Sequence, residues 1–158
     1  MSAAPPAGAA SGIEAFVAAA RAALPGEALA RWKVRHFGPM GNVLVPLIAS
    51  GEKTGTFALA EDFAADPAAA PATGDLYVVL DVDGRPALLY RILEAYTLPY
   101  GDIGHEHVQV EGRQARTVEA WRAIHWPYWG ATLRARGRDI SMQTPVIFQR
   151  FRVLYPAP

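Results

Sequence analysis

The spacing of apolar residues predicts helices early in the chain, strands in its middle, and a helix and a strand near its end. Helices are expected in five segments: 11–24, a short one holding Leu29 and Trp32 and ending near Phe37-Gly38, 43–48, 102–110 as a short helix or turn, and 117–136. The capping-box pattern Ser11-Gly12-Ile13-Glu14 starts the first helix, and Pro25-Gly26 ends it. Two prolines restrict the others, because Pro46 fits only a first helical turn and Pro127 interrupts the last helix.

Strands are expected in four segments rich in apolar and β-branched residues: 54–59, 76–80, 86–98 and 146–154. The second is apolar throughout, which is typical of a buried strand, and Asp83-Gly84 predicts a hairpin turn after it. An Ala/Pro/Asp-rich loop occupies about 60–73. In the last strand the alternation of side chains puts Phe148 and Phe151 on opposite faces.

This order of elements predicts an α+β fold with a small mixed or antiparallel sheet, curved into a barrel. The chain has 158 residues, which is enough for one domain with its own core. Residues 1–10 are low in complexity and are expected to be a disordered tail, so the domain is expected to cover 11–158.

The composition is that of a globular protein, with 51% hydrophobic and 19% charged residues. No apolar run approaches the roughly 18 residues that cross a bilayer, and the N-terminus lacks the features of a secretory signal. We therefore expect a cytoplasmic protein without membrane contact. The sequence has no cysteine, which excludes disulfides, thiolate metal sites and a cysteine nucleophile.

Charge is distributed unevenly along the chain. Residues 1–112 hold 7 Lys/Arg and 13 Asp/Glu, whereas residues 113–158 hold 8 Arg and only 2 acids. Arginines gathered on one face would attract phosphates, as in RNA-binding proteins. The alternative is a solvated face whose charge the acidic half of the chain balances. Nothing in the sequence indicates specificity for DNA.

The segment Ser50–Leu59 holds the strongest sign of chemistry. The chain carries only two lysines, Lys33 and Lys53, against thirteen arginines. Lys53 and Thr56 lie where a helix stopped by Gly51 gives way to a strand, so both side chains can reach one pocket. Lysine is the basic residue that loses its proton readily when it is desolvated. The alternative is structural: a cation favoured at a helix C-terminus and a strand-forming threonine.

Several short motifs occur in a definite order. They are Trp32 with Phe37-Gly38, Leu47-Ile48-x-x-Gly51-x-Lys53-Thr54-x-Thr56, Gly74-Asp75 before Val78-Val79-Leu80-Asp81, His107-x-x-x-Glu111-Gly112, Trp121-Arg122-x-x-His125, and Pro145-Val146 with Phe151-Arg152-Val153. In these motifs the chain resembles the ASCH domain family over about residues 29–156. The family has a small β-barrel fold related to the PUA RNA-binding domains, and the resemblance implies that fold here, with a cleft beside the Gly-x-Lys-x-x-Thr turn.

The resemblance also implies a function. Roles suggested for the family are RNA binding, RNA cleavage and, in small bacterial members, hydrolysis of the amide in N4-acetylcytidine. That hydrolysis is linked to a lysine, a threonine and a glutamate, which match Lys53, Thr56 and Glu111 here. No metal or other cofactor is implied.

Two departures from the family pattern concern the same region. Larger members continue the glutamate as Glu-Gly-Glu-Gly-Asp, whereas this chain has Arg113 two residues after Glu111. Ala58 replaces a frequent serine.

In an amide hydrolysis Thr56 offers the hydroxyl. Either Lys53 is the base, or Glu111 is the base and Lys53 stays cationic to hold the oxyanion.

Other residues are candidates for binding substrate or RNA rather than for catalysis. Trp121 and His125 fall one helical turn apart among further aromatic residues, which either fill a core or stack on a base. Arg122 and Arg113 are candidate phosphate contacts. His105-Glu106-His107 lacks a third ligand at metal-site spacing, so solvated loop histidines are favoured over a metal site.

An enzyme is therefore favoured over a binding module. The first hypothesis is a metal-independent hydrolase of an N4-acylated cytidine-type amide, and its partner is a modified nucleoside or RNA. The second is a ribonuclease that acts on single-stranded RNA, and the third is a non-catalytic RNA-binding module. The sequence does not indicate an oligomeric state.

Overall fold

The structure is a computed structural model that describes residues 7–156, with the side chains of residues 12–156. By the contacts between Cα atoms the chain divides into two compact units. The first unit is Met1–Gly51, Thr73–Leu93 and Phe151–Pro158, and the second is Glu52–Ala72 and Glu94–Arg150. The division leaves the expected single domain over 11–158 as a prediction.

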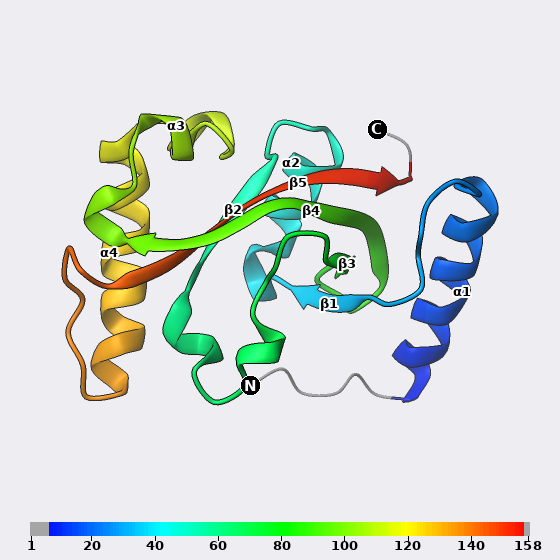
Figure 1. Ribbon diagram of the computed structural model, residues 1–158, viewed down its shortest axis with the longest axis horizontal. Helices are drawn as coiled ribbons and strands as arrows, with labels where there is room; N and C mark the ends of the chain where they lie inside the picture. The colour runs from blue at the N-terminus through cyan, green and yellow to red at the C-terminus, as the bar shows by residue number, and fades with distance from the viewer. Residues whose placement is uncertain (1–6, 157–158) are drawn as a thin grey trace. The chain divides into compact units, whose positions relative to one another are not determined.

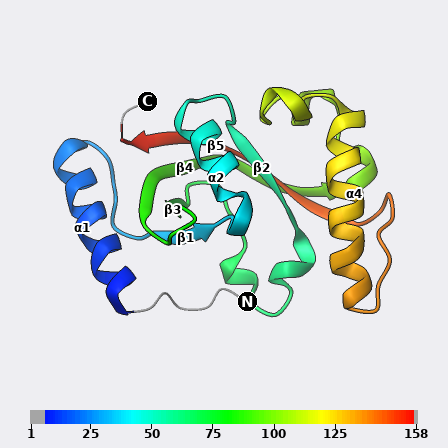
Figure 2. The ribbon, with the colours of Figure 1, turned by 180° about the vertical axis from the view of Figure 1, so that it is seen from behind.

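Five strands are hydrogen-bonded in the order β1-β3-β4-β5-β2. The strands are β1 (Lys33–His36), β2 (Gly55–Leu59), β3 (Leu76–Leu80), β4 (Pro86–Pro99) and β5 (Pro145–Tyr155). β1 pairs with β3 in parallel, whereas β3–β4 and β2–β5 pair antiparallel, so the sheet is mixed. The long strands β4 and β5 lie side by side (Figure 1), and β2 follows the other edge of β5 (Figure 2). The predicted α+β class with a mixed sheet is confirmed.

The first unit packs helix α1 (Ala7–Ala23) on strands β3 and β4. Ile13, Val17 and Ala20 repeat at helical spacing and are buried against Val78 and Leu89 of these strands. The helix starts four residues before the expected position, and residues 1–6 of the expected disordered tail lie outside the described residues.

The expected helix around Leu29 and Trp32 is wrong, because residues 33–36 form β1. This strand takes its backbone hydrogen bonds from β3, with Val34 opposite Val78. Its side chains follow a strand's two-residue period: Val34 packs on the apolar core, and the Arg35 guanidinium lies 4.4 Å from the ring centre of Tyr77. Pairing with a distant strand has overridden the local pattern.

Helix α2 (Gly41–Ala49) confirms the expected helix over 43–48. It begins earlier than expected, so Pro46 lies in its second turn and not in its first. The proline nitrogen therefore cannot donate to the carbonyl one turn earlier, a cost that the flanking buried Val45 and Ile48 offset. Gly51 ends the segment at φ +80°, a conformation that favours glycine.

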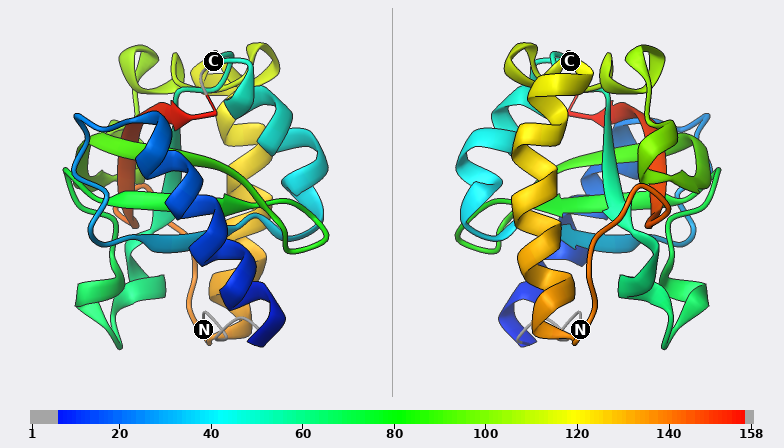
Figure 3. Two further views of the ribbon diagram at one scale, coloured as in Figure 1. Left: turned by 90° about the vertical axis from the view of Figure 1, so that its right-hand side faces the viewer. Right: turned by 90° about the vertical axis from the view of Figure 1, so that its left-hand side faces the viewer.

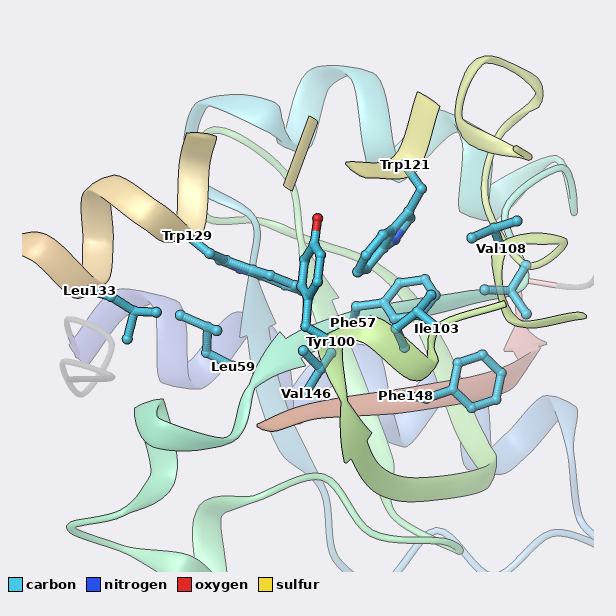
Figure 4. Packing of buried hydrophobic residues seen from close by; sticks show 11 residues of the cluster. Phe57, Leu59, Tyr100, Ile103, Val108, Trp121, Trp129, Leu133, Val146 and Phe148 are labelled. Carbon is cyan, nitrogen blue, oxygen red and sulfur yellow. The ribbon is translucent and has the colours of Figure 1, made fainter. Parts of the chain in front are cut away.

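The second unit holds β2, the short helix α3 (His105–Val108) and the long helix α4 (Val118–Ala135). Its core is aromatic: the rings of Phe57, Tyr100, Trp121 and Trp129 point toward one another (Figure 4), with Phe57 and Trp121 centred 4.9 Å apart. The expected loop over 60–73 contains two 3-10 turns, Ala60–Phe63 and Pro67–Ala69.

The expected interruption of the last helix at Pro127 is wrong, because α4 runs unbroken through it (Figure 3). The Thr117 hydroxyl accepts the Ala120 N–H at 3.1 Å and caps the first turn. Trp121 and Trp129 lie on either side of the proline and pack with Tyr100, so core packing holds both halves in line.

The opposite facing of Phe148 and Phe151 in β5 has a structural reason. Phe148 belongs to the aromatic core of the second unit, where its ring centre lies 5.6 Å from that of Phe57. Phe151 belongs to the first unit and stacks on Tyr90 at 4.1 Å. Phe148 and Phe151 therefore pack in different units, although one strand carries both.

Candidate active site

A buried ion pair joins Lys53 and Glu111 in the second unit. The Lys53 Nζ lies 2.5 Å from the Glu111 Oε2, and the two side chains are only 3% and 8% exposed. Groups separated by 57 intervening positions in the chain thus meet inside the protein, as the resemblance implied for them. Charged side chains are seldom buried unless they are paired, as these two are.

Backbone hydrogen bonds hold the two segments that carry this pair. The Thr54 N–H donates to the Val110 carbonyl at 2.8 Å, so the residues next to Lys53 and Glu111 are bonded directly. Arg116 adds two bonds from one guanidinium: its Nε donates to the Glu111 carbonyl and its Nη2 to the Glu52 carbonyl, both at 2.7 Å. Arg116 therefore fixes the spacing of the two segments, a role that the sequence analysis missed.

Gly55 allows strand β2 to lie close to both β5 and Val110. A Cβ at this position would collide with the Gln149 carbonyl oxygen and lie 2.7 Å from the Val110 Cβ. Any other residue would push strand β2 away from β5 or from Val110. The glycine between Lys53 and Thr56 is thus required by packing.

Thr56 is the second residue of β2 and is buried, with 8% of its surface exposed. Its partner across the antiparallel pair is Gln149 of β5. The neighbouring residues Phe57 and Phe148 are likewise opposite each other and face the aromatic core. Because side chains alternate along a strand, Thr56 and Gln149 share the other face.

His125 lies within electrostatic reach of the Lys53–Glu111 pair. Its ring stacks on Trp121 at 4.4 Å, and its Nδ1 lies 2.8 Å from the Trp121 carbonyl oxygen. A carbonyl only accepts, so Nδ1 carries a proton, and Nε2 is the acceptor when the ring is neutral. Burial lowers the pKa of His125; Lys53 acts in the same direction, and the Trp121 carbonyl and Glu111 oppose it.

The other predicted binding residues differ in exposure. Trp121 is fully buried, as the core alternative expects, with its ring facing Phe57 and Tyr100. The Arg122 Nη2 donates to the Gly101 carbonyl at 3.3 Å. Arg113 is 82% exposed, and its Nε lies 3.5 Å from Glu52, whose carboxylate also accepts the Arg113 N–H. The arginine that departs from the family pattern therefore contacts Glu52 and lies at the surface.

His107 differs from the expected solvated loop histidine, because it is 7% exposed. Its Nδ1 accepts the Gly104 N–H at 2.9 Å, so Nε2 carries the proton and donates to the Tyr96 hydroxyl at 3.0 Å. Both ring nitrogens thus serve the fold of the segment before Glu111. No cluster of metal-ligating side chains occurs among the described residues.

Most of the C-terminal arginines lie beside acids from the first part of the chain. Ion pairs within the units join Arg113 to Glu52, Arg136 to Asp62, Arg138 to Glu61, Arg150 to Glu94 and Arg152 to Glu27. Each acid comes from residues 1–112, so the uneven charge along the sequence is balanced in space. This is the pattern that the solvated-face alternative expects, and RNA binding by these arginines stays a prediction.

Comparison with known proteins relates the chain to one family. The sequence model of the ASCH domain matches residues 30–155. The ASCH domain from Lactobacillus crispatus JV V101 is similar in structure, with a TM-score of 0.76 and 19% identity over 93% of this chain and 94% of that one. Protein EF3133 from Enterococcus faecalis V583 has a TM-score of 0.78 and 22% identity, over 91% of this chain and 88% of that one. A search of curated protein sequences gave no match.

These likenesses confirm the predicted fold of the ASCH type. In the part of the chain that the structure describes, no helix is long and apolar enough to span a membrane.

Proposed function

The chain belongs to the ASCH domain family, and we propose that it hydrolyses the amide of an N4-acylated cytidine-type nucleoside. The observation that carries the proposal is the buried Lys53–Glu111 pair. Its lysine comes three residues before Thr56 in the chain. An acid and a base that share a short hydrogen bond away from water form a proton relay, which amide hydrolysis needs.

In the first half of the reaction the Thr56 hydroxyl oxygen attacks the carbonyl carbon of the amide. Its proton passes to the Lys53–Glu111 pair, and the carbonyl oxygen becomes an oxyanion. Return of that proton to N4 breaks the C–N bond, which releases the cytidine-type amine and leaves the acyl group as an ester on Thr56. Water then hydrolyses the ester by the same proton route, releasing a carboxylic acid and restoring the hydroxyl.

The pair can serve this route in two ways. If the Lys53 proton moves to Glu111, both groups become neutral, which a buried site tolerates, and the amine accepts the Thr56 proton. If Glu111 accepts the proton instead, Lys53 stays cationic and stabilises the oxyanion. We favour Lys53 as the base. A rate that is independent of pH above 6 would contradict a titrating lysine.

The test is turnover of N4-acetylcytidine by the purified protein in EDTA, followed by release of cytidine. Thr56→Val keeps the shape of the side chain and removes the hydroxyl, so we expect turnover to be lost. Thr56→Ser restores a hydroxyl and should recover part of it. Lys53→Ala should abolish turnover, whereas Lys33→Ala alters the other lysine of the chain and should leave turnover intact.

Lys53→Arg separates the two roles, because arginine stays charged and cannot act as the base. Activity in this variant would favour Glu111 as the base. If the wild type releases no cytidine, labelled single-stranded RNA is the next ligand: cleavage would identify a ribonuclease, and binding alone a recognition module. Polymer binding would weaken steeply with salt, unlike the turnover of a neutral nucleoside.

A further inference from the structure

Gln149 is a fully buried side chain whose amide has no hydrogen-bond partner. It is 0% exposed, and neither its Oε1 nor its Nε2 is bonded to any described residue. Proteins seldom bury both ends of an amide in this way, because each unpaired group loses its hydrogen bonds to water. A group left unpaired in the free protein is a natural contact for a ligand.

The register of the sheet places this amide beside Thr56. Gln149 and Thr56 are directly opposite each other in the β2–β5 pair. In antiparallel strands such residues point to the same face, with Cβ atoms roughly 4.5–5.5 Å apart. The amide therefore borders the hydroxyl to which we assign the attack on the substrate.

A primary amide presents one acceptor and one donor side by side. An N4-acylated cytosine presents the complementary pair on one edge, because its N4–H donates and its ring N3 accepts. We propose that Gln149 is the residue that recognises this edge, with its Oε1 accepting the N4–H and its Nε2 donating to N3. The inference rests on the proposed function, since it deepens the recognition of the same substrate.

This pairing would orient the acyl group of the substrate as well as select the cytosine ring. Two parallel hydrogen bonds fix the plane of the ring, in the way that Gln and Asn fix adenine. With N4–H and N3 both paired to Gln149, the acyl group lies on the C5 side of N4, and the attack requires the Thr56 hydroxyl to reach it there. An amide without an adjacent ring acceptor would satisfy only half of Gln149 and leave its Nε2 buried without a partner.

The first test replaces the amide by an apolar side chain of similar shape, Gln149→Met. Because it removes two unpaired polar atoms, we expect the melting temperature to rise by about 2–4 °C. We expect kcat/KM for N4-acetylcytidine to fall about 10- to 100-fold. A lower melting temperature would mean that the amide has partners inside the protein, and an unchanged kcat/KM would mean that it does not touch the substrate. Either result overturns the proposal.

Tyr90 offers a matched control in the first unit. Its hydroxyl is also buried without a partner, and the residue is 0% exposed. Tyr90→Phe should raise the melting temperature as Gln149→Met does, but it should leave turnover unchanged. A loss of activity in both variants would show that turnover follows the removal of any buried polar group, against a role for Gln149.

The second test changes the substrate by one atom. N4-acetyl-3-deazacytidine has a C–H in place of N3 and cannot accept the Nε2–H. The wild type should lose about 10-fold or more in kcat/KM on this analogue, whereas Gln149→Met should treat both substrates alike. Equal losses in the two proteins would overturn the assignment of Nε2 to N3.

Calorimetric binding of cytidine separates this inference from the proposed function. Cytidine keeps N3 and an N4–H, so the wild type should bind it at least 10-fold more tightly than Gln149→Met. If the wild type binds cytidine in this way but hydrolyses nothing, the amidohydrolase proposal fails and the recognition by Gln149 holds. If both proteins bind cytidine equally, or neither binds it, the recognition fails whatever the turnover.

Discussion

The two lysines of the chain form ion pairs of almost the same length in very different surroundings. In the first unit the Lys33 Nζ lies 2.6 Å from the Asp75 Oδ2, with the side chains 32% and 24% exposed. In the second unit the Lys53–Glu111 distance is 2.5 Å, but the exposures are 3% and 8%. Burial, and not the geometry of the pair, separates the two.

Burial changes what an ion pair can do. Water screens the Lys33–Asp75 pair, so breaking it leaves two groups that are still hydrated. The Lys53–Glu111 pair has lost most of that hydration, and neither charge is easily left alone. Only in the second pair does moving a proton between the two groups change the free energy of the site by a large amount. A site for proton transfer therefore needs the surroundings of Lys53, and an isolated short contact is insufficient.

The largest expected effect is on stability when one member of each pair is removed. Lys53→Met leaves Glu111 as a buried carboxylate without its cation, which should lower the free energy of unfolding by about 3–5 kcal/mol. Lys33→Met should lower it by less than about 1 kcal/mol. Urea unfolding of the two variants measures both values. Equal losses would show that burial does not explain the difference between the two pairs.

The double variant Lys53→Met/Glu111→Leu tests whether the unpaired buried carboxylate causes the loss of stability. Replacing both charges by apolar side chains of similar size leaves no buried ion, so most of the single-variant loss should be recovered. The corresponding Lys33→Met/Asp75→Leu variant should recover little, because little is lost at first. Urea unfolding of the four proteins in each cycle gives the coupling. A double variant at the buried site that is as unstable as Lys53→Met would contradict the argument.

Local sequence identifies the catalytic candidates, whose roles stay a prediction, but it does not identify the residues that hold them in place. Lys53 and Thr56 are three residues apart, so a short motif identifies them together, and the motif with Glu111 relates the third residue to the family. The contribution of Arg116 depends on two carbonyls from segments far apart in the chain. Its position in an arginine-rich stretch suggested phosphate binding instead, and no local signal separates the two roles.

The same limit explains the errors in the fold. Strand β1 forms because β3 lies beside it, and the apolar spacing around Trp32 contains no record of that partner. Helix α4 continues through Pro127 because Trp121 and Trp129 are held by Tyr100. Gln149 looks like an ordinary polar residue of a strand until the register places it opposite Thr56. Each of these features depends on contacts between distant segments, which a pattern of apolar residues does not encode.

A smaller effect is expected from pH, and it also depends on burial. Burial lowers the pKa of His125, with Glu111 and Lys53 as the charged groups that act on it. The unfolded chain therefore takes up this proton at a higher pH than the folded protein does. The stability from neutral His125 is complete above about pH 6.5 and is lost as the pH falls through the lowered pKa.

His125→Phe should reduce the loss of stability over this window, measured by urea unfolding at a series of pH values from 7 downward. Lys33→Met serves as the control and should keep the pH dependence of the wild type, because Lys33 does not act on His125. An identical slope in His125→Phe and in the wild type would show that His125 does not titrate in this range.

The smallest effect is expected at a third ion pair, whose cation is more exposed to solvent than either lysine. Arg113 is 82% exposed and Glu52 27%, with 3.5 Å between the Arg113 Nε and the Glu52 Oε1. Arg113→Ala should change the free energy of unfolding by no more than about 0.5 kcal/mol, less than Lys33→Met, because screening by water increases along the series. Its backbone N–H, which also donates to Glu52, remains in the variant. A loss as large as that of Lys53→Met would mean that exposure does not order the three pairs.

If the protein binds RNA through Arg113, the same variant should also reduce the salt dependence of that binding by about one unit of slope, and an unchanged slope would limit this arginine to its contact with Glu52.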